Sequence, residues 1–226
     1  KARNSPEQEN RMNVDVMTQI GAVNREVSDR NHEGKVRRVV SASRTFATSP
    51  DDLWEAITKP ERLARWFGSV SGDLRLGGSF QIKNNAKGEV TACKPPEMLA
   101  VTWRMFGDES WVQAHLSPSS NGGTLLKVEH ILSQRLFDRL YWSWYGAGAT
   151  GVGWELWLLG LDQHVGAGAA TTEELERWRV TDEGKDYLKR ATHDWARAEI
   201  AHGEREAKAM KRAARACTFY SKLAAH

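Results

Sequence analysis

The sequence predicts an α+β fold in which an antiparallel sheet comes first and a set of helices follows. Between residues 20 and 131, short runs of alternating apolar and polar residues are separated by turn residues, a pattern typical of an antiparallel meander. After Ile131 the apolar residues recur at the helical period. The 226 residues are enough for one well-filled domain with an extension, or for two small domains.

Two strands are expected at the start of the sheet, over residues 20–29 and 35–47. Gly34 lies in the short segment between them and can supply the positive φ that a hairpin turn often needs. Because the alternation in the first run is imperfect, a helix over residues 14–27 remains an alternative. Thr48–Asp52 then combines polar capping residues, a proline and early acids, which is typical of a helix start.

Two short helices are therefore expected over residues 50–67, the first ending before Pro60. Further strands with turn residues between them follow. Pro95 and Pro96 end one of these strands, because proline cannot continue a central strand. The expected strands cover residues 79–83, 88–93, 99–106, 111–116 and 124–131.

Residues 148–165 predict one long helix, because large apolar side chains recur there on a single stripe. Its glycines lower the helix propensity, so we expect them to allow a close approach to the sheet. Thr172, followed by glutamates, marks the start of a new helix. Residues 171–225 show amphipathic spacing, and we expect them to be mostly helical and to pack on the domain.

Nine short motifs together resemble the START-like helix-grip superfamily, also called SRPBCC. Within it they are similar to the branch of the heat-shock-protein-90 ATPase activator homologues and polyketide-cyclase-like proteins. The resemblance covers roughly residues 39–165, and its motifs are Leu53–Trp54, Trp66–Phe67, Gly77–Gly78, Gly88–Val90, Pro95–Pro96, Thr102–Trp103, Gly123–Thr124, Glu129–His130 and Gly153–Trp154.

The resemblance implies a bent antiparallel sheet wrapped on the long helix, with a hydrophobic cavity between them. We expect residues 12–168 to form this START-like domain and residues 169–226 to form a helical extension packed on it. Residues 1–11 are expected to be a flexible segment, which could derive from an expression tag, with Met12 as the natural start. The superfamily includes carriers, receptors, oxygenase subunits, cyclases and co-chaperones, so the resemblance alone names no reaction.

Aromatic side chains are the main candidates for the cavity wall. The resemblance places the second short helix over the cavity mouth and the long helix across the concave face of the sheet. The alternative is that these side chains only fill a core, since large aromatic rings are efficiently buried. The predicted ligand-binding residues are Trp66, Phe67, Phe80, Trp103, His130, Trp154 and Leu158.

Three titratable residues are candidates for acid–base chemistry. His130 shares strand parity with Leu126 and Val128, so its side chain should point inward, and imidazole titrates near neutral pH. His115 shares strand parity with Trp111 and Gln113, which indicates a polar face or a mixed pocket wall. Glu155 lies beside Trp154, and a carboxylate in an apolar cavity would have a raised pKa. The alternatives are a hydrogen-bonded core histidine and a solvated helix face.

The segment Tyr141–Tyr145 holds the densest group of aromatic residues and precedes Gly146. It could form a lid over a ligand entrance with the glycines after it as a hinge, or pack between the sheet and the long helix.

Several classes of function are excluded by what the sequence lacks. The net charge of +3 is spread among interleaved acids and bases, so no basic patch indicates nucleic acid. There is no phosphate-binding loop, no serine nucleophile motif, no metal-ligand spacing and no apolar run long enough for a membrane span. We expect no cofactor and no metal. Two cysteines without a disulfide framework favour the cytoplasm.

Three functions remain open from the sequence. The first is the binding of a small hydrophobic ligand, aromatic or polycyclic, in the internal cavity. The second is a cyclase or lyase that shapes a polyketide-like substrate in the same cavity. The third, suggested only by the family branch, is a co-chaperone-like module that binds a protein partner.

Overall fold

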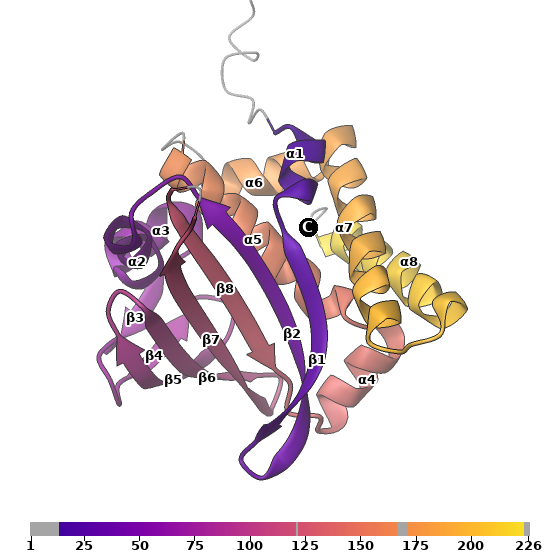
Figure 1. The fold of residues 1–226 in the computed structure, drawn as a ribbon, viewed down its shortest axis with the longest axis horizontal. Helices are drawn as coiled ribbons and strands as arrows, with labels where there is room; N and C mark the ends of the chain where they lie inside the picture. The colour runs from indigo at the N-terminus through magenta and orange to yellow at the C-terminus, as the bar shows by residue number, and fades with distance from the viewer. Residues whose placement is uncertain (1–13, 121, 167–170, 224–226) are drawn as a thin grey trace, which may run out of the picture.

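An eight-stranded antiparallel sheet curves around one long helix in the computed structural model, which describes residues 14–120, 122–166 and 171–223 (Figure 1). The strand order is β1-β2-β8-β7-β6-β5-β4-β3. This arrangement confirms the predicted α+β helix-grip fold. The strands are β1 Asn24–His32, β2 Lys35–Phe46, β3 Val70–Gly72, β4 Ser79–Ile82, β5 Lys87–Lys94, β6 Met98–Met105, β7 Asp108–Pro118 and β8 Thr124–Ile131.

Eight helices accompany the sheet in the described part of the chain. For the first segment, a strand over residues 20–29 and a helix over residues 14–27 were the two alternatives. The structure has a short helix, α1, followed by the strand β1. Strand β3 and helix α4 were not predicted. The helices are α1 Val16–Gly21, α2 Pro50–Thr58, α3 Pro60–Trp66, α4 Leu136–Tyr145, α5 Gly148–Gly166, α6 Thr172–Arg179, α7 Asp182–Ala201 and α8 Glu206–Leu223.

The pairing of β8 with both of its neighbours places His130 on the concave face of the sheet. His130 lies opposite Val40 of β2 and opposite Val112 of β7. Because side chains alternate across a strand, Leu126 and Val128 share this face, and both are buried. The inward orientation predicted for His130 is therefore confirmed.

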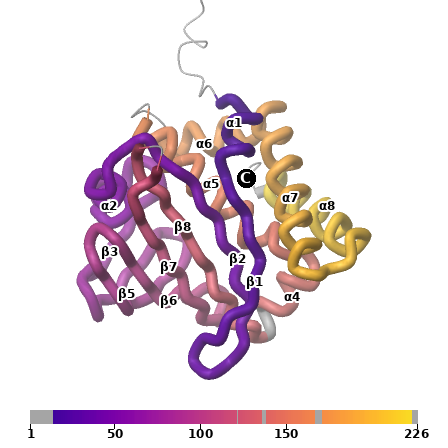
Figure 2. The backbone as a smooth tube through the Cα atoms, in the orientation of Figure 1, coloured from indigo at the N-terminus to yellow at the C-terminus, as the bar shows by residue number. Residues whose placement is uncertain are grey.

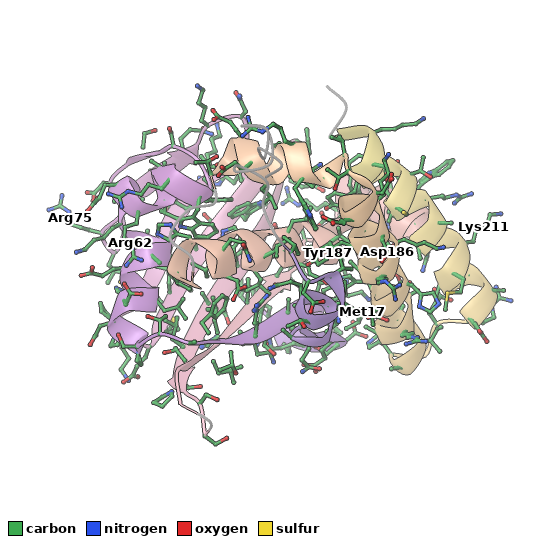
Figure 3. The ribbon with its side chains drawn as sticks, turned by 90° about the horizontal axis from the view of Figure 1, so that it is seen from above. Met17, Arg62, Arg75, Asp186, Tyr187 and Lys211 are labelled. Atoms are coloured by element: carbon green, nitrogen blue, oxygen red, sulfur yellow. The ribbon has the colours of Figure 1, made fainter. Side chains whose placement is uncertain are left out.

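Helix α5 lies between the sheet on one side and α7 and α8 on the other (Figures 1 and 3). Its glycines were expected to face the sheet, and this was wrong. A Cβ atom on Gly151 would meet the ring of Trp195 from α7, and one on Gly148 would lie 3.0 Å from the Cβ of Ala216 on α8. The missing side chains therefore allow α7 and α8, rather than the strands, to approach the helix.

A buried ion pair connects the start of the sheet to α5 and α7. The guanidinium of Arg25 on β1 binds the carboxylate of Glu155 on α5, and its Nε donates to Oε2 at 2.9 Å. The indole of Trp195 donates to the same Oε2 at 3.0 Å. Burial raises the pKa of Glu155 although Arg25 acts in the opposite direction. These contacts hold α7 against the long helix, beside the β1 end of the sheet (Figure 2).

A second buried carboxylate fixes the beginning of α5. Glu199 of α7 accepts a hydrogen bond from the backbone N–H of Ala147 at 2.6 Å and pairs with Arg212 of α8 at 3.1 Å. A carboxylate is favoured there because the first amides of a helix lack internal partners. The predicted segment 1–11 and the predicted boundary at residue 168 lie outside the described residues, so both stay predictions.

Candidate functional site

Two cavities lie between the concave face of the sheet and α5. The first, the apolar chamber, has a volume of about 370 Å³ and is lined by residues of β3 to β8, α2, α3 and α5. Arg75 at its edge points a largely exposed side chain to Asp73, with which it pairs at 2.9 Å. The walls are otherwise mainly carbon, as its representative residues Ile57, Phe67, Phe80, Val101, Val112 and Ala114 show.

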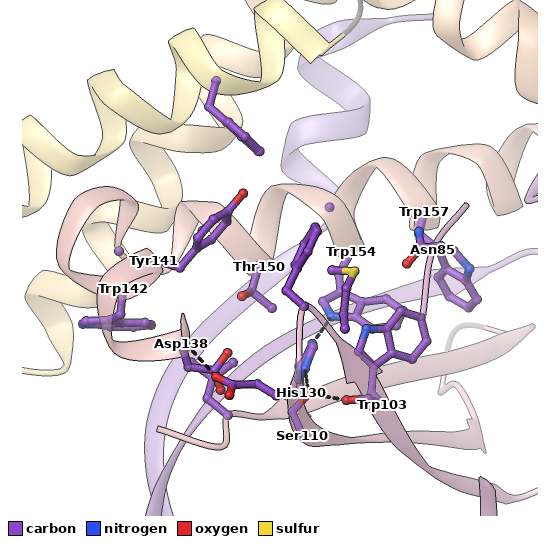
Figure 4. Close-up of a pocket in the computed structure, with 18 of the residues that line it drawn as sticks. Asn85, Trp103, Ser110, His130, Asp138, Tyr141, Trp142, Thr150, Trp154 and Trp157 are labelled. Carbon is purple, nitrogen blue, oxygen red and sulfur yellow. Dashed lines mark hydrogen bonds between the residues drawn. The ribbon is translucent and has the colours of Figure 1, made fainter. Parts of the chain in front are cut away.

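The second cavity, the mixed chamber, has a volume of about 400 Å³ and combines aromatic rings with polar groups (Figure 4). It is formed by the ends of β6, β7 and β8 together with α4, α5 and α8. Its representative residues are Trp103, Asp108, Ser110, His130, Asp138, Tyr141, Trp142, Thr150, Trp154 and Tyr220.

One layer of aromatic rings separates the two chambers. Four side chains line both cavities, namely those of Phe67, Trp103, Trp154 and Trp157. The ring centroids of Trp103 and Trp154 are 5.6 Å apart, and those of Trp154 and Trp157 are 5.7 Å apart. These separations are within the range of favourable aromatic pairs. The partition is therefore a packed aromatic cluster supplied by β6, α5 and the end of α3.

A chain of hydrogen bonds determines which ring nitrogen of His130 carries the proton. The indole N–H of Trp154 donates to Nδ1 of His130 at 3.1 Å. Because indole is a donor only, Nδ1 must be the unprotonated nitrogen. The proton then lies on Nε2, which donates to Oγ of Ser110 at 2.8 Å, and that hydroxyl donates to the carbonyl of Trp103 at 3.1 Å (Figure 4).

Burial makes His130 a neutral group at physiological pH. Desolvation lowers the pKa of His130 to about 4, because the charged imidazolium would be removed from water. Both ring nitrogens already have partners, so protonation of Nδ1 would break the bond to Trp154. This arrangement suits His130 to orient the Trp154 ring better than to exchange protons with a bound molecule.

Two of the predicted ligand-binding residues lie behind the cavity walls, which corrects their expected place. Trp66 is only 2% exposed, and its indole donates to the carbonyl of Ala56 at 3.1 Å. Leu158 is fully buried on α5. Neither lines either chamber, because each packs into the surrounding core. Phe80 lines the apolar chamber, and the other predicted side chains, Phe67, Trp103, His130 and Trp154, line one or both chambers.

The other two titratable candidates are also separate from the cavities. His115 lies on the convex face of the sheet, where its half-exposed ring is 3.8 Å from Glu129. A polar face and a mixed pocket wall were the two expectations for His115, and the structure shows the polar face. Glu155 faces Arg25 and Trp195, away from the chambers, because α5 is covered on that side by β1 and α7. The structure therefore brings only His130 of the three to the site.

The aromatic segment before α5 forms helix α4, which contacts β7, α5 and α8, and its expected role as a lid stays a prediction. Tyr141 and Trp142 of α4 line the mixed chamber, whereas Tyr145 packs against Phe219 of α8 with ring centroids 5.2 Å apart. Trp144 is 54% exposed. The segment is thus a helix that forms one wall of the chamber and also attaches α8.

Sequence reasoning missed three polar residues of the mixed chamber. Ser110 shares parity with Val112 on β7, so strand alternation could have identified it. Asp108 and Asp138 could not be found in this way, because they meet only where β7 approaches the unpredicted helix α4. Among the described residues, no group of three or more His, Cys, Asp or Glu side chains could hold a metal ion. No described helix is long and apolar enough to cross a membrane.

Solved structures with the same fold support this architecture over most of the chain. The crystal structure of CalU16 from Micromonospora echinospora is 29% identical, with a TM-score of 0.61, and the match covers 78% of this chain and 98% of CalU16. The solution NMR structure of CalU16 is 27% identical, with a TM-score of 0.65 and coverages of 81% and 97%. A conserved protein of unknown function from Enterococcus faecalis, 17% identical with a TM-score of 0.54, shares the fold over 79% of this chain and 92% of its own.

Sequence comparison gives the family. No curated protein matches the chain. The profile of one family matches residues 47–166, which extend from the residue after β2 to the end of α5 and include every lining residue of the apolar chamber. This match confirms the resemblance read from the motifs, and the chain therefore belongs to the family described as Activator of Hsp90 ATPase homolog 1-like protein.

Proposed function

We propose that this protein binds a small hydrophobic ligand, aromatic or polycyclic, in the cavity between the sheet and α5. The observation that carries the proposal is the apolar chamber, a space of about 370 Å³ walled mainly by carbon. Apolar side chains that face an unfilled cavity lose dispersion contacts and are left in contact with water. A hydrophobic ligand would restore those contacts, and aromatic walls suit a flat ring system.

The cyclase alternative receives little support from His130. It needs a titratable group that can exchange a proton with the substrate. His130 is the buried histidine at the site, and its Nδ1 and Nε2 are engaged by Trp154 and Ser110. Its low pKa also makes it a weak base near neutral pH.

The family description suggests a protein-interaction role as a further alternative. A docking module would present a contiguous apolar patch. The exposed large apolar residues of the described chain are instead distributed over α1, β2, the β3–β4 loop, the β6–β7 turn, β8, α4 and the α6–α7 turn. The cavity therefore favours ligand binding over the cyclase and protein-interaction alternatives.

The proposal can be tested with N-phenyl-1-naphthylamine, a neutral dye whose fluorescence rises in apolar surroundings. We expect saturable binding to the wild type and loss of the signal in Ala114→Phe and Val112→Phe, because both side chains line the apolar chamber and a phenyl ring would fill it. Thr91→Phe is the matched control, because Thr91 is exposed on β5 and lines neither chamber. Thermal melts verify that each variant is folded. Equal binding by all folded variants would refute the proposal.

A further inference from the structure

The mixed chamber differs from the apolar chamber in the charge of its lining. Among the described residues that line it, the charged side chains are two carboxylates, Asp108 and Asp138, and none is Lys or Arg. Both belong to the end of the cavity where β7 meets α4, on the far side of the Trp103–Trp154 partition from the apolar chamber.

We infer that the mixed chamber receives a positively charged group, such as a protonated amine, carried by an aromatic or polycyclic ligand. This inference rests on the proposed function, because it needs the space between the sheet and α5 to bind a hydrophobic ligand, and it extends that function to a charged ligand in the mixed chamber. The ring system would lie against the aromatic walls, and the ammonium would lie at the carboxylates.

The hydrogen bonds of the two aspartates bring no charged donor to either carboxylate. Oδ2 of Asp108 accepts from the backbone N–H of Asp138 at 3.1 Å. Oδ2 of Asp138 accepts from the N–H and the hydroxyl of Ser133, both at 2.6 Å, and from the N–H of Gln134 at 3.2 Å. All four donors are neutral, and neither carboxylate forms an ion pair within the described residues.

Three arginines border a cavity other than the mixed chamber. Arg38, Arg139 and Arg212 line a separate surface groove that Asp138 and Trp142 also border. Arg38 stacks on the ring of Trp142 at 4.4 Å, and Arg212 pairs with Glu199 and Glu204. These side chains do not line the mixed chamber, so they do not supply a cation inside it.

The aromatic walls of the chamber favour a cation for a second reason. Indole and phenol rings attract cations to their faces, and the attraction grows when water is excluded. Trp103 and Trp154 offer such rings, and the bond from Trp154 to His130 holds its indole in place. Because His130 is neutral, it does not repel a cation. A carboxylate ligand would instead meet two like charges and no described basic partner.

Three probes with the same ring system can separate charge from ring binding: naphthalen-2-ylmethanamine, naphthalen-2-ylmethanol and 2-naphthoic acid. At pH 7 these are a cation, a neutral molecule and an anion. Titration calorimetry with the full chain should show that the amine binds about tenfold more tightly than the alcohol, and the acid more weakly than both. The preference of the amine over the alcohol should decrease as salt is raised.

Two variants then test whether Asp108 and Asp138 supply the negative charge that binds the amine. Asp108→Asn and Asp138→Asn keep an oxygen acceptor for the local hydrogen bonds and remove the charge. Each should reduce the affinity for the amine several-fold and leave the affinity for the alcohol unchanged. Asp182→Asn removes a charge from the fully exposed start of α7 and should change neither affinity. If one aspartate variant fails to fold, the other variant and the three probes on the wild type still test the cation inference.

The outcomes distinguish the two proposals. If the alcohol binds and the amine binds no better, the cation inference is overturned and hydrophobic ligand binding stands. The same holds if the amine preference survives both folded aspartate variants. If none of the three probes binds while the naphthylamine dye does, the cation inference is overturned, and if the dye does not bind either, the proposed function itself fails.

Discussion

A Cβ atom on Gly151 of α5 would lie 2.2 Å from the ring of Trp195 on α7. The indole of Trp195 therefore rests directly on the backbone of the long helix, and its N–H reaches Glu155 one turn further along. Gly151 is required here because any side chain would occupy the space of the ring. This contact makes the C-terminal helices part of the support of the wall that lines the cavities.

The first prediction follows from this contact. Gly151→Ala should lower the free energy of unfolding by about 1–3 kcal/mol, because the added methyl overpacks a rigid ring. Gly166→Ala is the matched control, since a Cβ there meets nothing within 4 Å. Alanine has the better helix propensity, so the control should be neutral or slightly stabilising. Urea unfolding of the two variants measures the difference, and equal stabilities would contradict the close approach.

The second prediction concerns the whole extension. A chain that ends at residue 168 loses Trp195 from the surface of α5 and leaves the carboxylate of Glu155 without its indole partner. It also loses Glu199, which accepts the N–H of Ala147. The melting temperature or the solubility should therefore fall. A melting curve equal to that of the full chain would show that the extension does not stabilise the domain.

Glu155 and Leu158 show why the sequence could not place every residue of α5. A helix with one polar side reveals its buried face by its pattern. Helix α5 is covered by the sheet on one side and by α7 and α8 on the other, so apolar residues surround it almost completely. The pattern predicted the helix and its burial, but nothing in it could distinguish the cavity side from the side that faces the extension.

The strands gave a more reliable result because their side chains alternate between only two faces. Strand parity placed His130 and Trp103 facing inward, and both line the mixed chamber. Helix α4 was missed because its start lacks a side-chain cap at Arg135, and its aromatic residues are also common in strands. Asp138 belongs to that helix, so its position next to Asp108 could not be predicted without it. The charge of the chamber could therefore be recognised only in the structure.

The third prediction uses the buried histidine. In the unfolded chain His130 should titrate near 6.5, whereas in the folded protein its pKa is about 4. Because the folded pKa is depressed, the unfolded state takes up a proton first as pH falls from 6.5 towards 4, and stability is lost over that range. The loss due to His130 should reach about 2 kcal/mol at pH 5 relative to pH 7, given about 1.4 kcal/mol per pH unit.

Comparison with a variant that lacks only His130 isolates this contribution from other titrating groups. His130→Gln should lack it, so the stability difference between wild type and variant should shrink as pH falls from 7 to 5. His32 and His164 also have lowered pKa values from burial, but they are present in both proteins and cancel in the difference. Urea unfolding at several pH values measures this, and a difference independent of pH would contradict a neutral, buried imidazole.

The fourth prediction places a thiol in the apolar chamber. Cys93 of β5 lines this cavity, whereas Cys217 lies on α8 and lines neither chamber. In a Cys217→Ser background, a saturating amount of the naphthylamine dye should slow alkylation of Cys93 by a small apolar maleimide. At a dye concentration ten times its Kd, the rate should fall about tenfold, since only the free protein reacts. In Cys93→Ser the reaction of Cys217 should be unaffected by the dye, and protection of both thiols would indicate a general effect of the dye.

The last prediction concerns the aromatic partition. Trp103→Ala removes a ring that lines both chambers, so it should join them into one larger cavity while lowering the free energy of unfolding by about 3–5 kcal/mol. The naphthylamine dye should bind more weakly, because the Trp103 ring no longer contacts it. Trp66→Phe is the control: Trp66 lies behind the wall, so this change should lower stability through the lost bond to Ala56 and leave dye affinity unchanged. If Trp66→Phe weakened the dye and Trp103→Ala did not, the site would lie against α3 instead of at the partition.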